Sequence, residues 1–229
     1  MKLSILPVYV ALVFIICTGL TRRATSNRSI NAAEARSVYG LLLAFLAWTA
    51  IAFVLGLRGT HVDLMEHVPL LWQAFVPMVL WSTAFTFSGT LRNGLRGIAT
   101  STPGHWLVLI QALRIGALGG IIKGVRGEVA SDFVFWIGIP DFLFGLSALV
   151  VGRLLLRKAI GPRVLMAWNL VGFSLIFLPT FVPMSYWMNE PGFSFIFEFP
   201  MVLAPSIVIP ILISLNLLHA WGIWRTMEG

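Results

Sequence analysis

The sequence has a single cysteine, Cys17, and few charged residues. One cysteine excludes an intrachain disulfide framework and a zinc site built from several thiolates. Only 11% of the 229 residues are charged, whereas soluble domains average roughly a quarter. Intrinsic disorder is excluded as well, because 58% of the residues are hydrophobic and disordered chains contain few such residues. The composition therefore predicts a membrane protein.

Long apolar runs are what the sequence has in abundance. A helix needs about 20 mostly apolar residues to cross a bilayer, and seven such stretches occur: 3–20, 38–57, 69–87, 105–122, 133–151, 164–184 and 199–224. A β-barrel would need alternating strands of about ten residues, which these continuous runs do not offer. We predict an all-α integral membrane protein, a single polytopic domain over 1–229 with a bundle of about seven transmembrane helices. The first stretch is expected to be a true span, since no small-residue cleavage site follows it.

The basic residues are distributed unevenly between the two sides of this predicted bundle. Eleven follow the first, third, fifth and seventh spans: Arg22, Arg23, Arg28, Arg36, Arg92, Arg96, Arg153, Arg157, Lys158, Arg163 and Arg225. The other side has four: Lys2, Arg58, Lys123 and Arg126. Because positively charged loops stay in the cytoplasm, we predict a multi-pass protein of the cell inner membrane, with its N-terminus outside and its C-terminus cytoplasmic.

The formal net charge of +7 does not indicate nucleic-acid binding, because the basic residues are spread over separate short connections. Contact with anionic membrane lipid explains them better. Other membrane-protein subunits, or further copies of this chain, remain additional candidate partners.

Two charged residues lie inside predicted spans, Arg114 in the fourth and Asp141 in the fifth. A charge at the middle of a span is unfavourable by about 2.5 to 3.5 kcal/mol, so each requires a partner or a wet cavity. At 1.5 Å per residue the two lie within about one helical turn of the same depth. Since sequential helices are usually neighbours, we predict an ion pair between them, either as a packing device or as part of a solute site.

The residues around Asp141 indicate an irregular helix. Pro140 removes a backbone donor and Gly138 relaxes the helix, so the fifth span is expected to kink just before the carboxylate. Gly145 lies one turn beyond Asp141 on the same face, where it permits another helix to approach closely. Broken helices near the bilayer midplane are common in transporter sites.

Further polar residues gather in the predicted cytoplasmic half. Gln111 lies below Arg114, and Asn169, Asn216 and His219 form a predicted inner polar cluster. His219 is either a proton carrier, because imidazole titrates near physiological pH, or a neutral histidine hydrogen-bonded to an asparagine or a carbonyl.

Two connecting segments lead to further expectations. The Gly-, Ser- and Thr-rich segment 88–104 is expected to be a mobile loop. The segment HVDLMEH, residues 61–67, holds four potential metal ligands and is similar to the inverted zinc-protease pattern, but Asp63 replaces its first histidine. We expect an interfacial turn there and no metal.

The sequence offers little support for catalysis or a cofactor. Retinal needs an intramembrane lysine for its Schiff base, and Lys2, Lys123 and Lys158 all lie at interfaces. Haem is not expected either, since His105 and His219 come with no further haem signature. No catalytic residues are predicted, although an enzyme that holds a lipid-like substrate with Arg114 remains possible.

Two functional hypotheses follow. In the first, the chain binds or transports a small polar or anionic solute near the midplane, with Arg114 as the recognising charge, Asp141 as its countercharge and Gln111 beside them. In the second, it is a non-catalytic structural or assembly subunit of a larger membrane complex, and the ion pair only stabilises the bundle.

Overall fold

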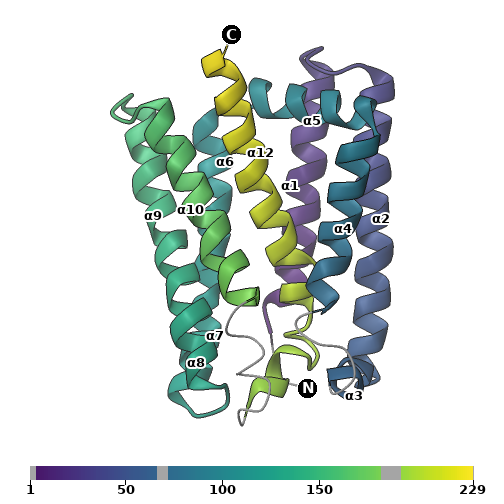
Figure 1. Cartoon of the computed structure of the whole chain (residues 1–229), viewed down its shortest axis with the longest axis vertical. Helices are drawn as coiled ribbons and strands as arrows, with labels where there is room; N and C mark the ends of the chain where they lie inside the picture. Colours follow the sequence, from purple (N-terminus) through teal and green to yellow (C-terminus); the bar gives the residue numbers. More distant parts are fainter. Residues whose placement is uncertain (1–3, 66–71, 182–191, 229) are drawn as a thin grey trace. The chain divides into compact units, whose positions relative to one another are not determined.

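The computed structural model describes residues 4–65, 72–181 and 192–228, and over these ranges it contains helices and no strands. Six helical segments are long and apolar enough to cross a membrane, and a bent pair of helices raises the number to seven. The predicted all-α, many-span architecture is therefore confirmed (Figure 1). The contacts group the chain into two units, each described separately below; that residues 1–229 form one domain stays a prediction.

The first unit comprises Met1–Glu66, Leu71–Thr102 and Phe197–Ile211. Its elements are α1 (Leu6–Ser26), α2 (Ala32–Leu57), α3 (Thr60–Met65), α4 (Trp72–Phe87), α5 (Gly89–Ser101) and the π-helical turn η4 (Ala204–Val208). Helices α1 and α2 run side by side and are joined by a short turn (Figure 1).

The first two spans have longer helices than the apolar stretches predict, because helix continues into their polar flanks. Helix α1 extends to Ser26. Helix α2 begins at Ala32, where a capping box satisfies its first backbone donors. The side chain of Asn31 accepts hydrogen bonds from the N–H groups of Ala33 and Glu34, and the Glu34 carboxylate accepts one from the Asn31 N–H.

The expectation of a mobile loop over 88–104 is wrong, because most of this segment is the amphipathic helix α5. The Ser88 hydroxyl caps it by accepting the N–H of Leu91 at 3.1 Å. The helix bends by 104° from α4 and lies across its end (Figure 1). The buried residues form one helical face: Leu91, Gly94, Leu95, Ile98 and Ala99. A Cβ at Gly94 would lie 3.0 Å from the Glu34 carbonyl oxygen, so α5 packs closely on the start of α2.

The second unit includes Pro103–Ile196 and Leu212–Gly229. One span consists of α6 (Gly104–Ile110), the 3-10 turn η1 (Gln111–Ala117) and α7 (Leu118–Val125), and the next of α8 (Ser131–Phe133), the π-helical turn η2 (Val134–Gly138) and α9 (Ile139–Leu156). They are followed by α10 (Pro162–Phe181), the short turn η3 (Phe193–Ile196) and the greater part of α12 (Ile209–Glu228). A core cluster of this unit contains Val108, Ala148, Val151 and Leu165.

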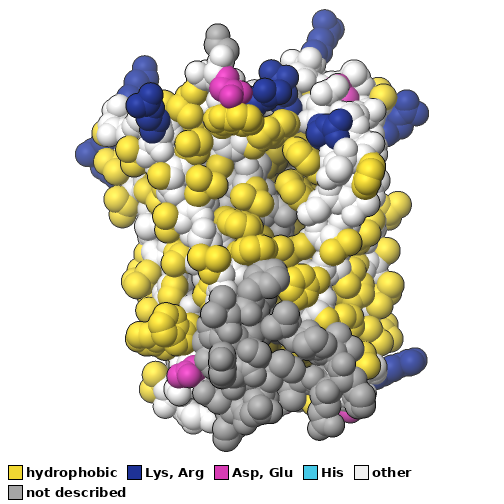
Figure 2. Space-filling model, in the orientation of Figure 1, with side chains coloured by type: hydrophobic (Ala, Val, Ile, Leu, Met, Phe, Trp, Pro, Cys, Tyr) yellow, Lys and Arg dark blue, Asp and Glu magenta, His cyan; other side chains and the backbone are white. Residues whose placement is uncertain are grey.

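The predicted spans coincide with these helices apart from their ends. Residues 69–71 and 182–184 of the predicted spans lie outside the described residues. The last span is helical from residue 204 rather than from 199. Hydrophobic side chains cover the sides of the helices, and Lys and Arg side chains lie at the helix ends (Figure 2). This distribution is typical of a polytopic membrane protein.

Candidate functional site

Arg114 and Asp141 form an ion pair inside the second unit, as the sequence predicts. The Arg114 Nη1 atom lies 3.2 Å from the Asp141 Oδ1 atom. Of the residues that the structure describes, these two carry the buried formal charges, with 3% and 7% of their surface exposed. A buried charge is strongly unfavourable unless it is paired. The pairing therefore explains how both residues can be kept inside the bundle.

The guanidinium group of Arg114 is positioned by a locally tightened helix. Arg114 lies in η1, a 3-10 turn between α6 and α7. In a 3-10 helix, side chains three residues apart eclipse one another, so Gln111 shares an edge with Arg114. The Gln111 Nε2 atom donates to the Leu212 carbonyl at 3.1 Å, while its Oε1 atom is buried without a hydrogen-bond partner. This edge thus combines a charge with an unused acceptor.

Asp141 directly follows an irregular turn of the helix, at the place where Pro140 predicts a kink. The irregularity is the π-helical turn η2, in which the Ile139 N–H bonds to the Val134 carbonyl five residues earlier. Pro140 has no N–H with which to continue the regular pattern. Mid-helix 3-10 and π turns are frequent at functional sites, and here one of each lies next to the two charges.

Gly145 brings the two charge-bearing helices together. A Cβ at Gly145 would lie 2.6 Å from the Ile115 backbone nitrogen and 2.9 Å from the Arg114 carbonyl carbon. Both are backbone atoms, which cannot move aside as a flexible side chain can. The close approach predicted for this face is present, and it allows the short Asp141 side chain to reach Arg114.

The remaining contacts of Arg114 leave one nitrogen unused. Nη1 also donates to the Gly172 carbonyl at 2.9 Å, and Cζ lies 4.8 Å from the centre of the Phe144 ring, within cation–π range. Phe144 packs so tightly on Gly172 that no Cβ could fit there. The Nη2 atom is buried and has no hydrogen-bond partner. Buried polar groups are nearly always satisfied, so this unpartnered nitrogen is an exception to the rule.

The Phe144 ring itself is held by a neighbouring tryptophan. It stacks on the Trp168 ring with 4.4 Å between the ring centres. The Trp168 indole Nε1 donates to the Ser147 hydroxyl at 3.0 Å, which in turn donates to the Phe144 carbonyl at 2.7 Å. This network gives the aromatic wall beside Arg114 a fixed orientation.

The structure brings together two of the three residues of the predicted inner polar cluster. The Asn169 Nδ2 atom lies 3.2 Å from the His219 Nδ1 atom and also donates to the Leu165 carbonyl at 2.9 Å. Because an amide nitrogen can only donate, the His219 Nδ1 atom accepts in this contact. Asn216 is buried, and neither side-chain atom of its amide has a hydrogen-bond partner. Arg114, Gln111, Asn169 and Asn216 therefore all present unsatisfied polar atoms in one unit.

Sequence reasoning missed a second buried polar group, in the first unit. The Trp48 Nε1 atom donates to the Ser206 carbonyl at 3.0 Å. Pro210, four residues after Ser206, has no N–H to donate to this carbonyl, and the Trp48 indole supplies a donor to it. Gln73 is also fully buried, with both polar atoms of its amide unpartnered. The available signals were a tryptophan deep within a span and a proline that frees a carbonyl.

The expected turn at His61 is a short helix, and the His61 side chain is buried. It lies in α3, where its Nε2 atom donates to the Ala52 carbonyl at 3.1 Å and its ring lies 5.1 Å from the Trp72 ring centre. Burial lowers the pKa of His61 below its ordinary value and outweighs the opposing effect of the Ala52 hydrogen bond. Asp63 is exposed, and residues 66 and 67 of the HVDLMEH segment lie outside the described residues. Within the described ranges, no three potential ligands gather for a metal.

No protein-family model, no curated protein and no solved structure matches the chain.

Proposed function

We propose that the chain binds a small polar or anionic solute within the membrane and moves it across. Arg114 is the charge that recognises the solute. Asp141 is the countercharge that stabilises the buried guanidinium group when no solute is bound. The single observation that supports this best is the buried Arg114 Nη2 atom, which has no partner although Nη1 makes two contacts.

The surroundings of this guanidinium group support a binding role. A guanidinium group presents several N–H donors in a planar fork that suits carboxylate and phosphate groups. The unsatisfied oxygens of Gln111 and Asn169 would accept hydrogen bonds from a polar solute or from water that accompanies it. The 3-10 turn at Arg114 and the π turn before Asp141 are irregularities of a kind that is frequent at hinges and functional sites. Many transport sites lie where a membrane-spanning helix departs from regular α-helical geometry.

The alternative is a structural subunit of a larger membrane complex. Gly145 packs tightly against Arg114, and Gly172 packs tightly against Phe144. The same packing would serve an ion pair that only stabilises the bundle. The two hypotheses differ in one outcome. A structural ion pair can be replaced by well-packed apolar side chains, whereas an arginine that binds the solute cannot.

The membrane orientation belongs to the same proposal. We place the N-terminus outside and the C-terminus in the cytoplasm of an inner-membrane protein, from the excess of basic residues on one side. Cysteine labelling tests it in a Cys17→Ala background with one exposed position from each side, Glu128→Cys and Ala159→Cys. An impermeant thiol reagent added to intact cells should label Glu128→Cys only; labelling of Ala159→Cys alone would reverse the orientation.

Ligand-dependent stabilisation of the purified protein tests the binding proposal. A ligand that binds only the folded state raises the melting temperature. We would screen inorganic phosphate, acetate and lactate against the wild type, Arg114→Gln and the exposed control Arg157→Gln. Stabilisation of the wild type and the control, but not of Arg114→Gln, is the expected result. Equal responses in all three proteins would contradict a role for Arg114 in recognition.

A further inference from the structure

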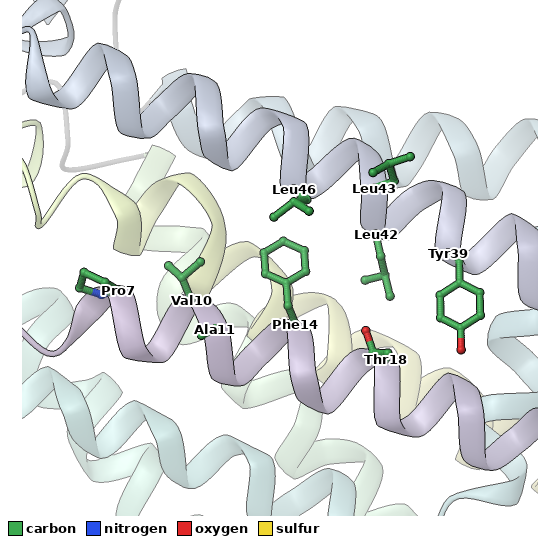
Figure 3. A pocket seen from close by; sticks show the side chains of 9 residues that line it. All are labelled: Pro7, Val10, Ala11, Phe14, Thr18, Tyr39, Leu42, Leu43 and Leu46. Atoms are coloured by element: carbon green, nitrogen blue, oxygen red, sulfur yellow. The ribbon is translucent and has the colours of Figure 1, made fainter.

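An apolar groove runs between α1 and α2 in the first unit (Figure 3). Its volume is about 490 Å³. The lining residues come from one face of each helix, between Pro7 and Thr18 of α1 and between Tyr39 and Leu46 of α2. From Pro7 to Thr18 the groove extends about 16 Å along α1 at 1.5 Å per residue. That length matches one leaflet of a hydrocarbon core roughly 30 Å thick.

The two ends of the groove differ in polarity. Most of its wall is aliphatic or aromatic, and its two hydroxyl groups, those of Thr18 and Tyr39, lie together at one end (Figure 3). Tyr39 is 38% exposed, so its ring is accessible from outside the bundle. A slot with an apolar body and a hydroxylated end fits an amphiphilic molecule.

Beyond the hydroxyl groups, the same helical faces continue into basic residues. Arg22 follows Thr18 by four residues, and Arg36 precedes Tyr39 by three, so each shares a face with its partner at the groove end. Both arginines are exposed, and the Arg36 Nε atom donates to the Ala32 carbonyl at 3.3 Å, which holds this side chain along α2. Glu34, the acidic residue of this turn, already accepts a hydrogen bond from the Asn31 N–H within the capping box.

We propose that the α1–α2 groove binds an anionic phospholipid. One acyl chain lies along the groove between Pro7 and Thr18, and the phosphate group lies at the level of Arg22 and Arg36, within reach of the Tyr39 hydroxyl. A zwitterionic lipid fills the same apolar slot but gains less from two cations. An apolar helix of another protein would fill the groove but would leave Arg22, Arg36 and the Tyr39 hydroxyl without a partner. This inference does not depend on the proposed solute site, which lies in the other unit.

Native mass spectrometry of the full chain, released from detergent with phosphatidylglycerol or phosphatidylcholine added, tests the proposal. The wild type is expected to retain phosphatidylglycerol about tenfold better. The double variant Arg22→Gln/Arg36→Gln should lose this preference. The matched control Arg153→Gln/Arg157→Gln removes two exposed charges from the end of α9 and should keep it.

A second variant tests the apolar part of the site without changing its charge. Ala11 is exposed and lines the groove, so Ala11→Trp should narrow the groove, leave the fold intact and reduce retention of both lipids. Equal retention of the two lipids by the wild type would overturn the proposal. So would an equal loss in the α9 control, which would indicate general charge attraction. A dimer that excludes lipid and dissociates in Ala11→Trp would assign the groove to a second copy of the chain instead.

Discussion

Gly145 packs directly on the backbone of Arg114: a Cβ at Gly145 would lie only 2.9 Å from the Arg114 carbonyl carbon. Asp141 precedes Gly145 by one helical turn, and its Oδ1 atom lies 3.2 Å from Arg114 Nη1. An aspartate side chain is short, so this ion pair depends on the two helix backbones approaching closely. The absence of a side chain at position 145 is therefore a condition for the buried pair.

Gly145→Ala should destabilise the protein by about 1 to 3 kcal/mol, because the new methyl group would have to displace backbone rather than a movable side chain. The melting temperature in mild detergent measures the effect. Gly120→Ala is the matched control: Gly120 also lies in a helix of this unit, but no atom lies within 4 Å of its potential Cβ. Equal melting temperatures for both variants would show that the close approach is not required.

Removing one member of the ion pair should destabilise the protein more than removing an exposed charge. Arg114→Ala or Asp141→Ala leaves an uncompensated buried charge, at a cost of about 3 to 5 kcal/mol. Arg157→Ala, at an exposed helix end, should change stability by no more than about 0.5 kcal/mol. Thermal unfolding and the yield of folded protein report the difference. Single variants as stable as Arg157→Ala would mean that the pair is not formed in the membrane.

The spans and the ion pair could be predicted from the sequence, because length, apolarity and buried charge restrict the possible structures strongly. Apolar runs of membrane length indicate the spans. Because an unpaired charge inside a span is strongly unfavourable, Arg114 and Asp141 at similar depth are predicted to pair. Pro140 predicted the irregular turn before Asp141. The 3-10 geometry at Arg114 was not predicted, because no residue type forces it in the way that proline forces a kink.

Other features were missed because they depend on packing between distant segments. Leu91, Leu95 and Ile98 have helical spacing, but the glycine and serine content of their segment favours a loop. The segment is helical because these residues pack against α1 and α2. The burial of His61 depends on the Ala52 carbonyl and the Trp72 ring, whose proximity follows only from the fold.

The hydrogen bond from Trp48 to Ser206 should stabilise the first unit by about 1 kcal/mol. Trp48→Phe removes this donor from the Ser206 carbonyl. Pro210→Ala supplies a backbone N–H four residues after Ser206, so the loss caused by Trp48→Phe should be smaller in that background. A double-mutant cycle of thermal stability measures this coupling. Strictly additive effects would mean that the indole does not replace the missing helical donor.

Acidification should destabilise the protein through His61. Burial lowers the pKa of His61 below the ordinary value of 6.5, so the unfolded chain takes up a proton there at a higher pH than the folded protein does. Stability from this residue is therefore complete above about pH 6.5 and decreases as the pH falls below it. Melting temperatures at pH 7.5 and 5.5 should differ less in His61→Gln than in the wild type. An unchanged pH response in His61→Gln would contradict the prediction.

The most direct test of the central proposal uses the double variant Arg114→Met/Asp141→Leu. These apolar side chains remove both charges together and leave neither unpaired, so the protein is expected to fold with a melting temperature close to that of the wild type. If Arg114 recognises a solute, the variant should nevertheless lose anion-dependent stabilisation and uptake of the same anion into proteoliposomes. A folded double variant that binds and transports as the wild type does would contradict the proposal and assign the pair a purely structural role.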